Sequence, residues 1–235
     1  MAVESKSFPV AATPLPAIKI RLQAHGSLDT YRRPFSWAQV IVAFLFIECA
    51  VWAARLSVRS RWSLAAGGVV LVFSIVDRPS VRRLGLGLPS AMGSGLVLGL
   101  GLTGAALMLL LTHWAGGTIP ANPLFPNMHM AWQYMIWALI QEFILQSFFY
   151  TRFEELFGSS RAVWVTATLF AAVHLPNVIL MTFTLIAGLF FCEMFRRSRS
   201  IYLLGLVHAL LGLTLSAAVP TDLLYHLRVG IGFLR

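Results

Sequence analysis

Five glutamate and histidine side chains lie well inside apolar stretches of the sequence. They are Glu48, Glu142, His174, Glu193 and His208. An ionisable group in the hydrocarbon region of a bilayer costs from about 3 to more than 10 kcal/mol, so it is by default a candidate for function. The stretch QEFILQSFFYTRFEEL, residues 141–156, raises this question most directly, because it places a carboxylate and two amides in an apolar segment.

Glu142, His174 and His208 form a set that can hydrolyse a peptide bond. A carboxylate can exchange a proton with water when a neighbouring imidazole assists it. A second imidazole can stabilise the oxyanion that develops on the attacked carbonyl. The same three side chains also match a catalytic zinc set of two histidines and one glutamate, which remains an alternative.

Other protease chemistries have less support in the sequence. The three aspartates, Asp29, Asp77 and Asp222, lie outside the apolar stretches, which excludes a pair of aspartates within the membrane. The H-E-x-x-H zinc motif is absent. A serine–histidine dyad stays open on composition, because Ser147 and Ser216 are near the histidines, although no G-x-S-x-G turn supports it.

The elements that must position these residues are membrane helices. The 235 residues are 58% hydrophobic and 11% charged, with a mean hydropathy of +0.77, whereas a soluble domain carries roughly a quarter charged residues. We predict an all-α, polytopic membrane helix bundle with about seven (six to eight) transmembrane helices. The predicted spans are 36–55, 63–77, 91–113, 130–151, 161–180, 182–195 and 201–219.

The sequence divides into three parts. Residues 1–35 are predicted to be a cytosolic N-terminal arm interrupted by prolines, residues 36–219 the transmembrane domain, and residues 220–235 an interfacial tail. Lys and Arg alternate between loops in a way that places the N-terminus in the cytosol. The formal charge of +9 is interpreted as an attraction of the basic residues to anionic lipid headgroups. We therefore expect an integral multi-pass protein (of the inner membrane in a prokaryote) that contacts the lipid bilayer and binds no nucleic acid.

The predicted topology brings the three candidate residues to similar depths. At 1.5 Å per residue, Glu142, His174 and His208 lie about 15, 20 and 10 Å from the cytosolic side. We therefore expect the three side chains, each from a different helix, to share one site. Glu48 is a rival, either as a second acid or as a partner of one of the histidines.

Other polar or glycine-rich features have simpler interpretations. Glu193 precedes Arg196 and Arg197 by three and four residues, the spacing of ion pairs on one helix face. The FEEL segment at 153–156 is predicted to be a solvated loop. GLGLTG at 99–104 matches a dinucleotide fingerprint but lies in an apolar helix, where Gly95 and Gly99 instead predict close helix packing.

The order and spacing of the candidate residues resemble the CPBP family of intramembrane glutamic endopeptidases, which includes type II CAAX prenyl proteases and Abi proteins. The family motifs are E-E-x-x-x-R, F-x-x-x-H and H-x-x-x-N on successive helices. QEFILQ (141–146), FAAVH (170–174) and HALLG (208–212) stand at these positions. The resemblance covers about residues 82–219, with RRLGLGLPS similar to the family's L-G-L loop.

This resemblance implies an intramembrane endopeptidase that needs no cofactor. Its substrate would be a membrane-associated protein or peptide, with or without a lipid modification, cut near its C-terminus or membrane anchor. Glu142, His174 and His208 carry over intact. The departures from the family pattern are Gln141 for the first glutamate, Gln146 for the arginine and Gly212 for the asparagine.

Three explanations of the departures remain open. In the first, Glu142 takes over the acid–base role in a divergent active enzyme. In the second, the protein is a proteolytically inactive relative that acts as a membrane binding or immunity protein. In the third, the protein performs metal-dependent or other membrane chemistry. In the active case, Glu142 and His174 activate water and His208 holds the oxyanion.

Three further residues have supporting roles in the active case. Gln141 and Gln146 orient Glu142 or the scissile peptide. Asn177 either supplies the amide missing at Gly212 or caps the helix break near Pro176.

Overall fold

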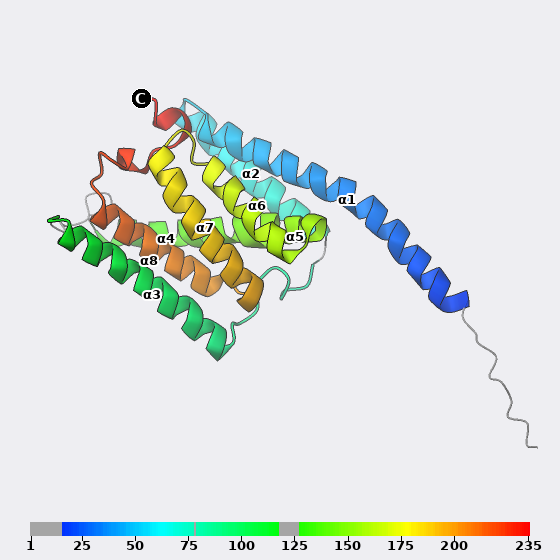
Figure 1. Cartoon of the computed structure of the whole chain (residues 1–235). Coiled ribbons are helices and arrows are strands. Elements are labelled where there is room, and N and C mark those ends of the chain that lie inside the picture. The colour runs from blue at the N-terminus through cyan, green and yellow to red at the C-terminus, as the bar shows by residue number, and fades with distance from the viewer. Residues whose placement is uncertain (1–15, 78, 118–126) are drawn as a thin grey trace, which may run out of the picture.

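The computed structural model describes residues 16–77, 79–117 and 127–235, with side chains described from residue 34 onward (Figure 1). The protein is all-α. In chain order, the elements are α1 (Pro16–Val51), α2 (Leu56–Val76), α3 (Ala91–Trp114), α4 (Met128–Glu142), the wide-turn π-helix η1 (Phe143–Tyr150), α5 (Thr151–Phe157), α6 (Ser159–Ala172), α7 (Val178–Ser198), α8 (Tyr202–Ala218), and the short 3₁₀ turns η2 (Tyr225–Leu227) and η3 (Gly230–Gly232).

Several helices have the length and composition of membrane spans. Within the described ranges, four are long and apolar enough to cross a bilayer: Pro34–Val51 within α1, α2, α3 and α7. The apolar helix α8 is shorter, at 17 residues. These helices agree with the predicted membrane bundle, whereas the count of about seven spans remains a prediction.

The first helix differs from its prediction. It begins at Pro16 and continues through Pro34, so the expectation that Pro34 interrupts the arm was wrong. Residues 1–15 of the predicted arm, with Pro9 and Pro14, lie outside the described residues. Proline is favoured at the first position of a helix, where its missing N–H would be unpaired in any case. Inside a helix it removes one main-chain donor, yet α1 runs on for 17 residues beyond Pro34. In Figure 1 the N-terminal half of α1 extends beyond the other helices.

The predicted span 161–180 was also wrong. Helix α6 ends at Ala172 and α7 begins at Val178, so residues 173–177 form a turn. Pro176 accounts for this break, because a proline disfavours helical conformation in the residue before it and cannot donate to the preceding turn. His174 therefore lies in the turn between two helices.

The segment around FEEL is helical, where the sequence predicted a solvated loop. Helices α4, η1 and α5 follow one another without a break from Met128 to Phe157. Glu154 pairs with Arg199, and Glu155 pairs with Arg83. These ion pairs connect α5 to the loops that precede α3 and α8.

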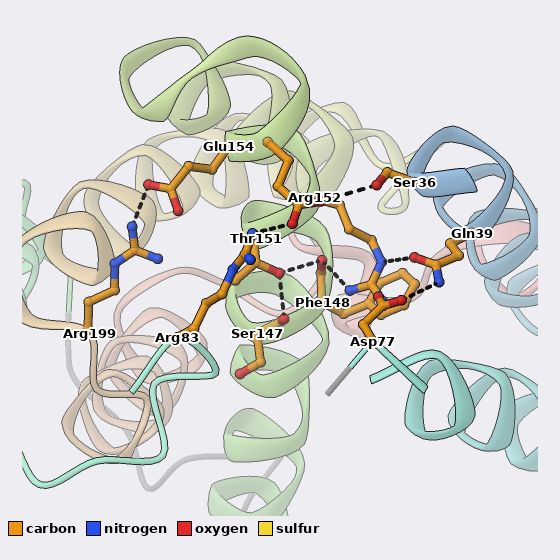
Figure 2. Close-up of polar contacts among 11 residues, drawn as sticks. Ser36, Gln39, Asp77, Arg83, Ser147, Phe148, Thr151, Arg152, Glu154 and Arg199 are labelled. Carbon is orange, nitrogen blue, oxygen red and sulfur yellow. Dashed lines mark hydrogen bonds and ion pairs between the residues drawn. The ribbon is translucent and has the colours of Figure 1, made fainter. Parts of the chain in front are cut away.

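A buried arginine anchors the same end of the bundle (Figure 2). The guanidinium of Arg152 donates to Gln39 of α1 at 2.7 Å and to Asp77, just after α2, at 2.6 Å. It also lies 3.7 Å from the centroid of the Phe148 ring in η1. Burial lowers the pKa of Arg152 to about 10, and the nearby Asp77 carboxylate opposes this shift. The contacts fix η1 against α1 and the end of α2.

Helix α8 packs between α3 and α4, and α6 packs against α7. Gly101 allows α3 to approach α8, because a Cβ at this position would lie 2.5 Å from Cγ1 of Val207. At Gly95 and Gly99 a Cβ would meet no described atom within 4 Å. The close approach predicted for Gly95 and Gly99 was therefore wrong, and it occurs at Gly101.

The C-terminal tail packs over the turn between α6 and α7. The Gly230 amide donates to the Leu175 carbonyl at 2.7 Å, and Leu224 is fully buried. Whether residues 220–235 also lie at a membrane interface, as the sequence predicts, remains a prediction.

Candidate functional site

Glu142 and His208 are in direct contact at the interface of α4 and α8. Oε1 of Glu142 lies 2.8 Å from Nδ1 of His208. Glu142 is the last residue of α4 and is completely buried, whereas 11% of the His208 side chain is exposed. The sequence predicted that these residues share a site, and the structure brings them together.

Gln146 supports the carboxylate from the next turn. Its Nε2 donates to Oε2 of Glu142 at 3.2 Å. The intervening segment belongs to η1, in which main-chain hydrogen bonds reach five residues along the chain; such wide turns occur frequently at functional sites. The other amide atom of Gln146, Oε1, is buried without a hydrogen-bond partner among the described residues.

Aromatic rings enclose His208. The ring of Phe191 in α7 stacks on the imidazole at a centroid distance of 4.9 Å and an interplanar angle of 20°. The ring of Phe170 in α6 meets it edge-on at 5.9 Å. The imidazole is thus clamped between α6 and α7 while its Nδ1 faces Glu142, which leaves Nε2 as the nitrogen available for chemistry.

His174 joins the site through Phe170. The Phe170 ring also meets the His174 imidazole edge-on, at a centroid distance of 5.0 Å. Nδ1 of His174 lies 2.7 Å from the Phe170 carbonyl oxygen. A carbonyl only accepts hydrogen bonds, so Nδ1 carries the hydrogen and Nε2 of the neutral ring is an acceptor. The sequence paired Glu142 with His174, whereas the contact in the structure is with His208.

Asn177 makes the contacts of a structural residue. Its Oδ1 accepts from the Leu180 amide at 3.0 Å and caps α7. Its Nδ2 donates to the Leu224 carbonyl at 2.9 Å and to the Arg228 carbonyl at 3.2 Å, which ties the C-terminal tail to the turn. Of the two roles that the sequence left open for Asn177, these contacts favour the cap.

Both candidate serines donate their hydroxyls to main-chain carbonyls. Ser147 donates to the Leu84 carbonyl at 2.5 Å, and Ser216 donates to the Leu213 carbonyl at 2.9 Å. A hydroxyl hydrogen that is donated to a carbonyl oxygen is not donated to an imidazole in this arrangement. The geometry therefore gives no support to a serine–histidine dyad.

Two other glutamates have partners of their own. Glu48 accepts from the indole of Trp52 at 2.9 Å on α1. Glu193 pairs with Arg196 and Arg197, at 2.7 and 2.6 Å, as the sequence predicted. Neither glutamate has a described contact with His174 or His208.

Gln141 lies half-buried beside Glu142. The sequence gave Gln141 an orienting role, which stays a prediction. Sequence reasoning also missed Tyr134 of α4, which places its hydroxyl against Gly212 of α8. The sequence gave only a weak indication of this contact, namely a glycine, Gly212, one helical turn after His208.

A zinc site would require the side chains of Glu142, His174 and His208 to lie together as metal ligands. Among the residues that the structure describes, no three His, Cys, Asp or Glu side chains come together as a metal-binding group. Glu142, His174 and His208 thus do not form a ready-made zinc site.

Comparison with protein families gives a match to the type II CAAX prenyl endopeptidase Rce1-like model over residues 123–214. This range contains Glu142, His174 and His208 and is narrower than the 82–219 expected from the sequence motifs. Comparisons with curated proteins and with solved structures gave no match. Residues 123–214 are thus a domain of the Rce1-like type II CAAX prenyl endopeptidase (CPBP) family.

Proposed function

We propose that this protein is an intramembrane endopeptidase that hydrolyses a peptide bond near the C-terminus or membrane anchor of a membrane-associated protein. The observation that carries the proposal is the contact between the buried Glu142 carboxylate and the His208 imidazole, within a domain of a protease family. The seven-span topology with a cytosolic N-terminus belongs to the same proposal.

The charge on Glu142 decides how the pair works. A buried carboxylate without a compensating proton or cation is strongly unfavourable. His208 is an ionisable side chain in direct contact with it. A protonated His208 balances the carboxylate and carries a hydrogen on Nε2, which donates to the substrate carbonyl oxygen as negative charge develops there.

His174 then acts as the general base. Its Nδ1–H is held by the Phe170 carbonyl, so Nε2 accepts a proton from water. The water oxygen attacks the carbonyl carbon, and the resulting oxyanion accepts the hydrogen bond from His208. The C–N bond breaks as the proton passes from His174 to the departing nitrogen. The products are a new carboxyl group on one fragment and an amine on the other.

Glu142 acts through His208 in this scheme. The sequence assigned Glu142 to water activation together with His174, whereas the contacts favour a role in keeping His208 charged and oriented. The amide of Gln146 donates a hydrogen bond to the second carboxylate oxygen of Glu142. Because the amide is neutral, it adds no second cation that would compete with His208 for the carboxylate.

The test is hydrolysis of a defined peptide by the full chain in liposomes. The probe has an S-farnesyl cysteine followed by three residues at its C-terminus, the arrangement of a prenylated C-a-a-X sequence. We expect release of the C-terminal tripeptide, measured by mass spectrometry. A second probe that lacks the farnesyl group shows whether the lipid is required. Peptide binding without any tripeptide release would contradict the proposal and favour an inactive, binding relative.

A further inference from the structure

Arginines gather at the turn between α1 and α2, and the C-terminal end of the chain lies beside this turn in Figure 1. Arg59 of α2 donates from Nη2 to the Ala53 carbonyl at 3.4 Å, and Arg235 of the tail donates from Nη1 to the Ala54 carbonyl at 3.0 Å. Because Ala53 and Ala54 are neighbours in the chain, the two guanidinium groups meet the same turn.

Two more arginines accompany this pair. A Cβ built on Gly232 would lie 3.8 Å from Nη2 of Arg59 and 4.0 Å from Cβ of Arg228, so the Arg228 side chain begins close to the Arg59 guanidinium. Arg55 follows Ala54 directly and is exposed, as is Arg228. Together these residues form the arginine cluster: Arg55, Arg59, Arg228 and Arg235.

Among the described residues, no carboxylate forms an ion pair with the arginine cluster. The described ion pairs involve other arginines, namely Arg83, Arg152, Arg196, Arg197 and Arg199. Glu48, near the same end of α1, accepts from the indole of Trp52. Nε of Arg59 is buried without a hydrogen-bond partner in the described part of the chain. A guanidinium stays protonated and has five N–H donors, so the cluster offers both positive charge and spare donors to an anion.

The arginine cluster lies at the level of lipid headgroups. The helical segments on either side of the turn, Pro34–Val51 and Leu56–Val76, each have the length and composition of a membrane span, so the short turn between them lies where hydrocarbon gives way to headgroups. Trp52 in this turn is exposed, and tryptophan is enriched at that level. In the predicted topology this end faces away from the cytosol, where Lys and Arg are less common, so topology alone does not account for the arginines.

We propose that the arginine cluster binds the phosphate of an anionic lipid headgroup, of the phosphatidylglycerol type, in the leaflet that surrounds the turn between α1 and α2. The planar guanidinium fork matches the oxygens of a phosphate, whereas a zwitterionic headgroup would bring a second cation to the cluster. Leu56 and Leu64 of α2 are exposed, so apolar surface for the acyl chains adjoins the cluster. This inference does not depend on the proposed endopeptidase function.

The first test is lipid binding by the full chain in detergent, measured by native mass spectrometry with added phosphatidylglycerol or phosphatidylcholine. We expect the wild type to bind phosphatidylglycerol at least about tenfold more tightly, the effect of one charged hydrogen bond. Arg55→Gln with Arg228→Gln should remove this preference. Neither side chain has a described hydrogen bond, so thermal unfolding without lipid should match the wild type.

The matched control is Arg82→Gln with Arg161→Gln, which removes the same charge from exposed arginines at the opposite end of the bundle. Its affinity for phosphatidylglycerol should stay within about twofold of the wild type, because distant exposed charges are screened. Equal affinity of the wild type for the two lipids would overturn the inference. So would wild-type affinity in Arg55→Gln with Arg228→Gln, or an equal loss in the control.

A second test separates a lipid from a soluble phosphate. A ligand that binds the folded protein raises its Tm. We expect phosphatidylglycerol to raise the Tm of the wild type and of the control variant, but not that of Arg55→Gln with Arg228→Gln. Inorganic phosphate, compared with chloride at equal ionic strength, should leave the Tm unchanged because it has no acyl chains to pack on α2. Equal stabilisation by phosphate and by the lipid would assign the cluster to a soluble phosphate and overturn the lipid site.

Discussion

The carboxylate of Glu142 lies 2.8 Å from the imidazole of His208, although 66 residues separate them in the chain. Helices α4 and α8 pack against each other, and this packing brings the two residues together. Phe170 and Phe191 then fix the imidazole from α6 and α7. Four helical elements therefore determine the geometry of one pair, which explains how a charge can be held in an apolar bundle.

Removal of the imidazole should damage both stability and activity. His208→Ala leaves the buried Glu142 without its partner, which costs about 3–5 kcal/mol for a buried pair. His208→Asn keeps an amide that can donate to Glu142, so it should lose less stability while also failing to cleave. Thermal unfolding in detergent, together with peptide cleavage, measures both effects. Equal stability of His208→Ala and the wild type would show that the pair carries no structural role.

Asn177 should matter for stability rather than for the chemistry. Asn177→Ala removes the cap of α7 and the donors to two tail carbonyls, a loss of about 2–4 kcal/mol. The matched control is Asn127→Ala, which removes the cap of α4 and should cost about 1 kcal/mol. Thermal unfolding compares the two variants. At a temperature where Asn177→Ala is folded, its kcat should be near that of the wild type; a 100-fold lower kcat would assign Asn177 to the reaction.

Helix packing gives a test that is independent of the site. Gly101→Ala forces a methyl group against Val207 and should lower stability by about 1–3 kcal/mol through overpacking. Gly99→Ala, on the open face of the same helix, should be neutral or stabilise slightly, because alanine favours a helix more than glycine does. If thermal unfolding shows the opposite order, α3 does not approach α8 as described.

The sequence predicted features that depend on local patterns. Apolar runs predicted most of the helices, the i,i+3 and i,i+4 spacing predicted the Glu193 ion pairs, and the motif order placed Glu142 and His208 in one site. These predictions need only helical periodicity and the high cost of a charge in lipid.

The features that the sequence did not predict depend on contacts between distant helices. The notch that Tyr134 fills at Gly212 requires the relative rotation of α4 and α8. Likewise, the sequence could not show that Gly101, rather than Gly95 or Gly99, lies at the contact with α8, because all three occur in one apolar helix. His174 was placed inside a helix because the apolar run continues past Pro176, although the proline ends α6 early.

If the Glu142–His208 pair drives peptide hydrolysis, replacing the Glu142 carboxylate with an amide must slow cleavage, and the cleavage rate of Glu142→Gln measures this. The matched control is Glu48→Gln, which changes a glutamate that is bonded to Trp52 on α1. We predict that Glu142→Gln lowers kcat for the farnesylated peptide by about 10²–10⁴-fold, while Glu48→Gln stays within about twofold of the wild type, since it lies outside the pair. Cleavage by Glu142→Gln at the wild-type rate would show that the Glu142–His208 pair does not drive hydrolysis.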